Sequence, residues 1–537
     1  MNIHFSRYIS VFACVVLLSS CAQRGRPDGG PKDTEPPKAV SSTPENFSTN
    51  YDRDEITINF NEYVKLKNPR QQIFFSPPIE PRPNIYPTGP ASKYIRLDVE
   101  SDSLEEDIIT YTVNFGKSIE DNNEGNVLPY YKYVFSTGDY VDSLQVEGNV
   151  FDAYQRVSDE NITVMLYPLD STYSDSVVYN ETPRYISFVR DSTSLFSIDN
   201  IKAGDYKMVA ISDKNNNYKF DPAQDKIGFV EDTLKIPTNQ LYDILVFKEE
   251  LDFEGFRPKQ ISRQHFEFGF RGRLKDYKID LLSETNEPFE AKYFKDAETD
   301  TLHYWYKPYL EKDSLLFAFS NQGRTDTLEI RPKQIEEDSL KISEVRPEKN
   351  KLLADFKLKA NTPISRFQKD SIRMMDKDSI PVDFQLEVDT LYNHLVFKFE
   401  KEESQSYQID LFPGAITDFF DTKNDSLNYK YTTKALADFG NLELTITNVD
   451  EFPIIVELVD EKGKVESSVY ETESPTVNFK LVKPGFYYIR LIYDLNANGR
   501  WDTGDFLKGV KPEPVLYEAQ TVEIRANWDD VLTISLY

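Results

Sequence analysis

Short segments in which apolar and polar residues alternate recur along most of this chain. Two clear cases are residues 56–60 (ITINF) and 111–115 (YTVNF), and turn-forming Asn, Asp, Gly and Pro separate such segments. A period of two puts alternate side chains on opposite faces of an extended segment, so each case predicts a β-strand with one buried face. The pattern therefore predicts an all-β fold of β-sandwich domains in tandem.

The length of 537 residues is too great for one hydrophobic core, so several domains are expected. We expect five of them after the first 38 residues, with the third inferred by elimination. The expected boundaries are 39–138, 142–250, 251–337 (a sandwich of unassigned type), 338–436 and 437–537.

The first of these segments contains PPKAVSSTPENF, ITINFNEYV, TYTVNFGKSIEDNNEGNVL and YKYVFSTG in that order. This order resembles the bacterial Ig-like domain known from S-layer proteins, in which the region of Asp121 to Asn126 is a turn. Residues 338–436 repeat part of it, because SYQIDLFPGAITD parallels TYTVNFGKSIED. We interpret 338–436 as a diverged Ig-like domain.

Residues 142–250 resemble the transthyretin-like, carboxypeptidase-regulatory type of sandwich, with Ile162, Val164 and Leu166 alternating. An internal repeat links this segment to 437–537. KAGDYKMVAISDKNNNYKFDPAQD returns as KPGFYYIRLIYDLNANGRWDTGD, with nine positions from the glycine to the first aspartate in both copies. A shared period of this kind predicts one supersecondary unit used twice.

Each copy of the repeat ends in a loop rich in oxygen-bearing side chains. In the second copy they stand at positions 1, 3, 5, 9 and 12 of a loop with Gly499 at position 6, and Arg500 offers its carbonyl at position 7. This spacing is typical of a calcium loop. The predicted ligands are Asp494, Asn496, Asn498, Arg500, Asp502 and Asp505.

The loop of the first copy is less regular, because Tyr218 stands at position 6 and the last acid comes one place late. Its predicted ligands are Asp213, Asn215, Asn217, Asp221 and Asp225. The alternative for both loops is an Asx-rich turn whose side chains cap their own backbone. In either case the expected role is structural, with Ca²⁺ as the one possible cofactor and none for catalysis.

The N-terminal 20 residues have the character of an export signal. Arg7 precedes an apolar run of about ten residues, which is too short to span a bilayer. The run ends in Leu18-Ser19-Ser20-Cys21, which resembles the lipobox of bacterial lipoproteins. The resemblance implies cleavage before Cys21 and its modification with acyl chains such as palmitate, and residues 21–38 then form a flexible tether.

Taken whole, the chain resembles the multi-domain Ig-like lipoproteins of Bacteroidota, including the GGPKD-x-x-PP segment of the tether. That resemblance implies an outer-membrane protein held by its lipid anchor. The resemblance favours the cell surface, to which acidic residues just after the cysteine help direct such lipoproteins. Asp28 is the one acid close behind Cys21, so the periplasmic face of the outer membrane stays open as the alternative.

The amino-acid composition excludes several classes of ligand and of catalytic site. The formal net charge is −28, which repels nucleic acid and attracts cations. Cys14 leaves with the signal and Cys21 is acylated, so no thiol remains for a disulfide, a zinc cluster or a nucleophile. We expect the three histidines of the mature chain, His265, His303 and His394, on strand surfaces rather than in a catalytic pair.

No nucleophile with a base, phosphate loop or zinc-ligand pair has usable spacing, so we expect a protein that is not an enzyme. The leading hypothesis is a structural and protein-interaction scaffold, an accessory subunit of an outer-membrane protein assembly or secretion complex. Its expected partners are an outer-membrane β-barrel or other lipoproteins. The alternatives are a surface glycan-binding or adhesion module, using Tyr304, Trp305 and Tyr306 if exposed, and a hydrolase with an unrecognised site.

Overall fold

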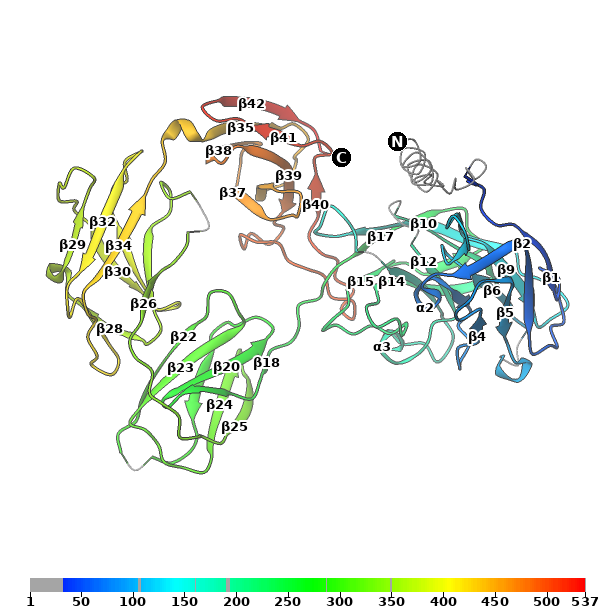
Figure 1. Cartoon of the computed structure of the whole chain (residues 1–537), viewed down its shortest axis with the longest axis horizontal. Coiled ribbons are helices and arrows are strands. Elements are labelled where there is room, and N and C mark those ends of the chain that lie inside the picture. Colours follow the sequence, from blue (N-terminus) through cyan, green and yellow to red (C-terminus); the bar gives the residue numbers. More distant parts are fainter. Residues whose placement is uncertain are drawn as a thin grey trace, which may run out of the picture. The chain divides into compact units, whose positions relative to one another are not determined.

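The computed structural model describes residues 32–104, 108–159, 161–189, 194–285, 287–347 and 350–536. The predicted signal segment 1–20, Cys21 and most of the predicted tether lie outside them. Within these ranges nearly all regular structure is strand, and the strands form five successive sandwiches of packed sheets (Figure 1). The expectation of an all-β chain of tandem sandwiches is confirmed. None of the described helices has the length and apolar character that crossing a membrane requires.

The chain divides into two compact units. The first contains residues up to 144 with 199–202, and the second contains 145–198 and 203–537. Sandwich 1 belongs to the first unit, and the second holds sandwiches 3 to 5 and nearly all of sandwich 2.

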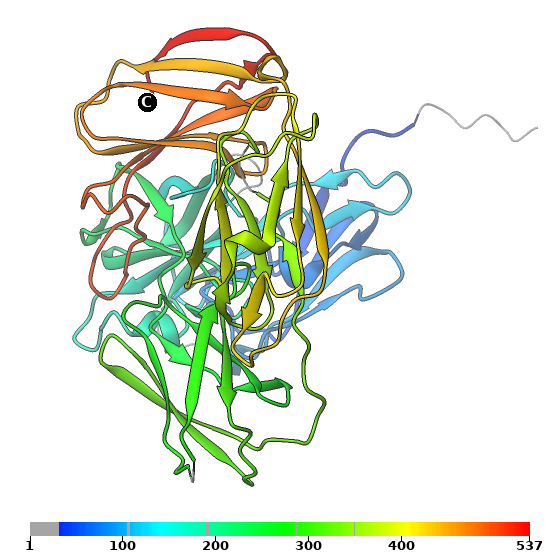
Figure 2. The ribbon, with the colours of Figure 1, turned by 90° about the vertical axis from the view of Figure 1, so that its left-hand side faces the viewer.

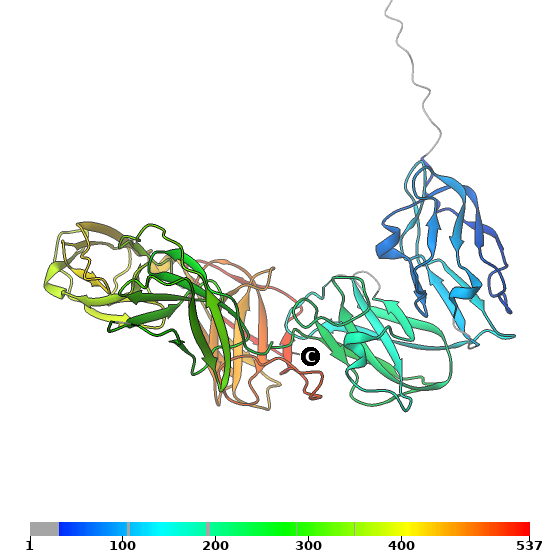
Figure 3. The same ribbon diagram turned by 90° about the horizontal axis from the view of Figure 1, so that it is seen from below.

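Sandwich 1 packs the sheet β4-β5-β2-β7-β8, with β1 beside β2, on the sheet β3-β6-β9 (Figure 3). Ile56, Ile58 and Phe60 of β2 point into its core, as their alternation predicted. Its elements are β1 (Ala39–Thr43), β2 (Ile56–Leu66), α2 (Pro69–Gln72), β3 (Phe74–Ser76), β4 (Asn84–Tyr86), β5 (Ser92–Asp98), η1 (Ser101–Ser103), β6 (Thr110–Asn114), β7 (Ile119–Asp121), β8 (Val127–Leu128) and β9 (Lys132–Ser136).

Strand β6 differs from the expected strand with one buried face, because all five of its residues are buried. Tyr111 and Val113 enter the core, while polar groups satisfy the other face. The Thr110 hydroxyl donates to Asp142 Oδ2 (3.0 Å) and accepts the backbone N–H of Asp142 (2.8 Å). Alternating polarity therefore predicted the strand correctly, but it did not predict that the second face of the strand is buried as well.

Sandwiches 2 and 5 share one topology. In sandwich 2 the sheets are β13-β10-β17 and β12-β11-β14-β15, and in sandwich 5 they are β38-β35-β42 and β37-β36-β39-β40. The pairs β10 with β17 and β35 with β42 are parallel in both copies. The repeat seen in the sequence is thus a repeat of the whole sandwich.

The elements of sandwich 2 are β10 (Leu144–Asp152), β11 (Ile162–Pro168), α3 (Val177–Asn180), β12 (Tyr185–Phe188), β13 (Leu195–Ile201), β14 (Gly204–Ser212), β15 (Ile227–Phe229), β16 (Leu234–Ile236) and β17 (Leu241–Val246). Those of sandwich 5, drawn in orange and red in Figure 2, are η3 (Leu436–Asp438), β35 (Gly440–Ile446), β36 (Ile454–Val459), β37 (Val465–Glu471), β38 (Thr476–Val482), β39 (Gly485–Tyr493), β40 (Val515–Tyr517), β41 (Val522–Ile524) and β42 (Asp529–Ile534).

Sandwich 3 packs the sheet β18-β20-β23-β22, with β19 beside β20, on β21-β24-β25 around an aromatic core. Its strands are β18 (Glu254–Gly255), β19 (Lys259–Ser262), β20 (His265–Arg271), β21 (Lys278–Leu281), β22 (Glu290–Lys295), β23 (Thr301–Lys307), β24 (Leu315–Asn321) and β25 (Arg324–Ile330).

Sandwich 4 follows the strand pairing of sandwich 1, with two strands, β27 and β28, in the place of the long β2. Its elements are β26 (Ile342–Glu344), β27 (Phe356–Ala360), β28 (Ile364–Phe367), η2 (Lys369–Ser371), β29 (Ile372–Met375), β30 (Gln385–Asp389), β31 (His394–Lys398), β32 (Ser406–Leu411), β33 (Ile416–Asp418) and β34 (Leu427–Thr432).

Candidate functional site

The loop after β39 is organised around Asp494, the first predicted calcium ligand. Its side chain is fully buried, and its carboxylate accepts the backbone N–H groups of Asn498 (3.0 Å) and Gly499 (2.7 Å). Gly499 has φ of +80°, a left-handed conformation that glycine adopts without strain. Asp494 thus shapes the loop by capping its own backbone.

The other predicted residues of this loop also bond to one another. Asn496 and Asn498 both donate through Nδ2 to Asp502 Oδ2, and Arg500 forms an ion pair with Asp502 Oδ1 (2.8 Å). Asp505 is bound instead by Lys508 (2.6 Å). The structure therefore groups Asp494, Asn496, Asn498 and Asp502 within one bonded loop.

Glu513 is a member of this loop that sequence reasoning missed. Its carboxylate accepts the backbone N–H groups of Leu495 and Asp502, each at 2.8 Å. Burial raises its pKa above the ordinary value despite these donors. It lies eight residues beyond the end of the calcium-loop pattern, so no local spacing pointed to it.

The loop after β14 has the same construction. Asp213 accepts the N–H groups of Asn217 (3.2 Å) and Tyr218 (2.7 Å), and burial raises the pKa of Asp213. The fully buried Asp225 accepts those of Lys214 (3.1 Å) and Asp221 (2.9 Å). Asn215 is exposed.

These contacts are those of the Asx-turn alternative. Across the described ranges, neither loop brings three carboxylates within 4.8 Å of one another. Calcium binding by either loop remains a prediction.

The C-terminal loop has a second role, because its distal half packs on sandwich 2. The Thr503 hydroxyl donates to the carbonyl of Lys248 (2.6 Å), and the N–H of Phe506 donates to Glu249 Oε1 (2.7 Å). The buried ring of Phe506 meets Phe229 edge to face at 5.4 Å between centroids. The loop of one repeat copy is therefore docked on the other copy.

A buried charge lies beside this interface. Arg490 of β39 is fully buried and donates through Nε to Glu457 Oε2 of β36 (2.6 Å). The ring of Tyr154, from sandwich 2, lies 4.2 Å from the Arg490 guanidinium carbon. The Tyr517 hydroxyl donates to the carbonyl of Tyr154 (2.8 Å), which ties the two sandwiches together at the same place.

The aromatic triplet considered for glycan binding is buried. Tyr304, Trp305 and Tyr306 are each at most 2% exposed. The prediction that these three residues form an exposed sugar-binding surface is therefore wrong. Tyr304 and Tyr306 belong to the core of sandwich 3. Trp305 faces the other side of the sheet and packs with Phe294 of its own sandwich and Phe419 of sandwich 4.

The expectation that the histidines lie on strand surfaces is wrong for two of the three. His265 and His394 are buried, and His265 lies next to His303 with 3.0 Å between Nε2 and Nδ1. Burial, with the neighbouring His303 ring second, lowers the pKa of His265 to about 3. The 38 residues between the two histidines gave no sign of this contact, which depends on the pairing of β20 with β23.

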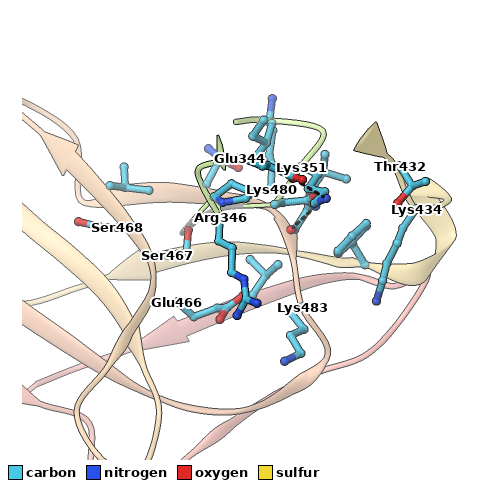
Figure 4. Close-up of a pocket in the computed structure, with 18 residues that line it drawn as sticks. Glu344, Arg346, Lys351, Thr432, Lys434, Glu466, Ser467, Ser468, Lys480 and Lys483 are labelled. Carbon is cyan, nitrogen blue, oxygen red and sulfur yellow. Dashed lines mark hydrogen bonds and ion pairs between the residues drawn. The ribbon is translucent and has the colours of Figure 1, made fainter. Parts of the chain in front are cut away.

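A cavity of about 1120 Å³ lies between sandwiches 4 and 5 (Figure 4). It is bordered by the loop after β26, by the end of β34 and by strands β37 and β38. The side-chain amide of Asn350 in sandwich 4 donates a hydrogen bond to the carbonyl of Leu481 in sandwich 5 (3.2 Å). The cavity is therefore built from both sandwiches.

Cations dominate the charged part of the lining. Five basic side chains stand against two carboxylates, Glu344 and Glu466, in a chain whose net charge is −28. Lys351 is paired with Glu344 (3.6 Å), and Figure 4 shows Arg346 extending toward Glu466. The basic residues are Arg346, Lys351, Lys434, Lys480 and Lys483. Such a surface attracts a carboxylate-bearing or phosphate-bearing ligand.

Several solved structures align with the chain at low sequence identity and low TM-score. Domains 1–6 of the surface layer protein SbsC align at 11% identity with a TM-score of 0.16, over 91% of this chain and 66% of that chain. Domains 4–9 of SbsC align at 10% identity and a TM-score of 0.21, over 80% and 64%. BcpA, the major pilin subunit of Bacillus cereus, aligns at 12% identity and 0.13, over 73% and 99%. The chain spans just under two thirds of the SbsC fragments, and likeness at these scores carries no argument about function.

No curated protein matches the chain. A family model does, over one part of it. The model described as a bacterial Ig-like domain matches residues 33–137, which confirms the resemblance expected for sandwich 1. The match covers well under half of the chain, and what it identifies is the similarity of residues 33–137 to bacterial Ig-like domains.

Proposed function

We propose that this protein is a non-enzymatic scaffold, held at the outer membrane by acyl chains on Cys21, that binds other envelope proteins. Membership in an outer-membrane protein assembly or secretion complex fits this role. The expected partners are an outer-membrane β-barrel or other lipoproteins.

The observation that carries the proposal is the docking of one repeat copy on the other. Phe506 and Thr503 of sandwich 5 contact residues 229 and 248 of sandwich 2, more than 250 positions earlier in the chain. Trp305 and Phe419 join sandwiches 3 and 4 in the same unit. Sandwiches that are joined by side-chain contacts as well as by linkers present loops and strand edges in a defined arrangement, as a scaffold requires.

The basic cavity between sandwiches 4 and 5 is the candidate partner contact. Its cations stand out in an acidic chain, and a concentrated patch of opposite sign directs association with an acidic partner surface.

The test is affinity purification of the tagged full chain from gently solubilised native outer membranes, with mass spectrometry of the bound proteins. A stoichiometric barrel or lipoprotein supports the proposal, and a chain that is recovered alone contradicts it. Replacing Cys21 with Ser should move the protein from the membrane fraction to the soluble fraction.

Two charge-reversal variants test whether the basic cavity is the surface that binds the partner. The variant R346E/K480E/K483E should lose the partner, because three cations of the cavity become anions. The matched control K235E/K259E/K430E changes three exposed strand lysines by the same total charge and should retain it. Equal loss in both variants would mean that net charge, and not the cavity, determines binding.

A further inference from the structure

The outer face of the sheet in sandwich 3 carries two histidines and a glutamate that converge. His265 and Glu267 are two apart on β20 and so share one face, and Glu267 is paired in register with His303 of β23. Their neighbours Phe266 and Tyr304 point the opposite way, into the core. Strand pairing therefore brings three potential metal ligands together from two strands.

The three ligand atoms lie within 4.8 Å of one another, and among the described residues this is the one group of three His, Cys, Asp or Glu side chains that meets that limit. His265 Nε2 is 3.0 Å from His303 Nδ1, and Glu267 Oε1 is 3.8 Å from the same His303 atom. Two nitrogens that each bind one zinc ion at about 2.1 Å are themselves about 3.0 to 3.4 Å apart. The observed spacing matches that geometry.

The surroundings hold the rings in place. His303 Nε2 is 3.3 Å from Asp296 Oδ2, and Asp296 is itself fixed by the N–H groups of Glu298 and Thr299, each at 2.8 Å. A carboxylate on the far nitrogen of a histidine orients the ring and raises its basicity as a ligand. His303 also packs against Phe294, with 5.0 Å between ring centroids.

The second ring is held by stacking. His265 lies flat on Trp305, with 4.0 Å between centroids and 9° between planes. Its Nδ1 is buried and has no hydrogen-bond partner in the described part of the chain. Metal binding at His265 Nε2 requires the neutral tautomer with the proton on this Nδ1, and the ion then takes the place of the hydrogen bond between the two imidazoles.

We propose that His265 Nε2, His303 Nδ1 and the Glu267 carboxylate bind one divalent transition-metal ion of the zinc class, with solvent in the remaining position. Two imidazoles and one carboxylate select Zn²⁺, Ni²⁺ or Cu²⁺ over calcium and magnesium, which prefer all-oxygen ligands. His303 and Glu267 are partly exposed, at 19% and 28% of the side chain, so an ion can enter from solvent. The site is separate from the Asp/Asn loops and from the basic cavity.

The site stands next to the contact between sandwiches 3 and 4. Trp305 and Phe294, which pack on His265 and His303, also pack on Phe419. A bound ion would cross-link β20 to β23 beneath this contact. The expected role of the ion is to stabilise the contact between sandwiches 3 and 4.

The test is titration of the full chain, after chelator treatment, with ZnCl₂ in a calorimeter and with Co²⁺ in an absorption spectrometer. The expected result is one ion per chain at a Kd below about 10 µM, with a visible Co²⁺ spectrum of nitrogen ligation. H303A and E267Q should each weaken binding at least about tenfold. H394A, which removes a buried histidine of sandwich 4, should bind as the wild type does.

Three outcomes would overturn the proposal. They are no binding in this range, equal binding by H303A, and Co²⁺ binding without the nitrogen-ligand spectrum, which would indicate the acidic surface. Circular dichroism of each variant checks folding, and E267Q keeps the side-chain volume in case the histidine variants do not fold.

Discussion

Asp213 and Asp494 cap the backbone of equivalent loops in the two copies of the repeat. Each follows a nine-residue strand, and each carboxylate accepts the backbone N–H groups of the residues four and five positions further along the chain. The acceptor is retained although position 6 is tyrosine in one copy and glycine in the other. The shape of both loops therefore rests on the aspartate.

Replacing Asp494 with Ala should destabilise sandwich 5 by about 2 kcal/mol, because the backbone N–H groups of Asn498 and Gly499 lose a charged acceptor. Denaturant unfolding followed by the fluorescence of Trp501, in the same loop, measures the change. The control N215A alters an exposed member of the homologous loop and should be nearly neutral. An unchanged stability in D494A would show that solvent replaces the cap.

Calcium binding is tested separately. If the C-terminal loop binds the ion, adding calcium at about 100 times Kd to EDTA-treated protein should stabilise it by about 2.7 kcal/mol and raise Tm. D502N should abolish the rise, because Asp502 is one of the predicted ligands and already gathers two asparagine amides. A Tm that does not respond to calcium would leave both loops as plain Asx turns.

The buried pair of Arg490 and Glu457 should be sensitive to the loss of one partner. R490M leaves the carboxylate of Glu457 buried without its cation and should cost about 3 to 5 kcal/mol. The same change at the exposed Arg525, which pairs with Glu523, should cost less than about 1 kcal/mol. The double variant E457Q/R490M should recover part of the loss in thermal unfolding, and no recovery would mean that packing against Tyr154 matters more than charge.

Phe506 should hold the two repeat copies together. F506A empties a buried aromatic site and should cost about 3 kcal/mol or more, with faster proteolysis of the 494–513 loop. The adjacent L507A removes a side chain that is 57% exposed and is the control. Equal proteolysis rates in the two variants would argue against docking in solution.

Asp121 should make sandwich 1 acid-sensitive. Burial alone would raise its pKa, but the N–H groups of residues 123 to 126 outweigh this and hold the pKa below the ordinary value of 3.8. A carboxyl whose pKa is lower in the folded state stabilises the fold above that ordinary value, and the contribution is lost as pH falls through the folded-state pKa.

D121N should therefore be less stable than the wild type at pH 7, and the gap should narrow as pH falls below about 4. Hydrogen exchange of the amides of residues 123–126 across this range gives the measurement. D139N, at an exposed site, should follow the wild type at every pH. A gap that is independent of pH would exclude the charge of Asp121 as the cause.

The sequence by itself determined the strands, the repeat and the positions of the two Asp/Asn loops, because these depend on neighbours along the chain. Alternation over five residues defines a strand face, and Asp494 reaches donors only four and five residues away. The same local signals identified sandwich 1, whose order of strands and turns is characteristic enough to match the bacterial Ig-like domain.

Tertiary structure alone decided which distant residues meet. His265 and His303 are joined by strand register, Trp305 is covered by a neighbouring sandwich, and Thr503 reaches the carbonyl of Lys248 across 255 positions. Periodicity states which face of a strand is apolar, but not which strand lies beside it or what covers its other face. The metal-ligand group and the basic cavity both arise from such long-range contacts, and neither could be predicted from spacing along the chain.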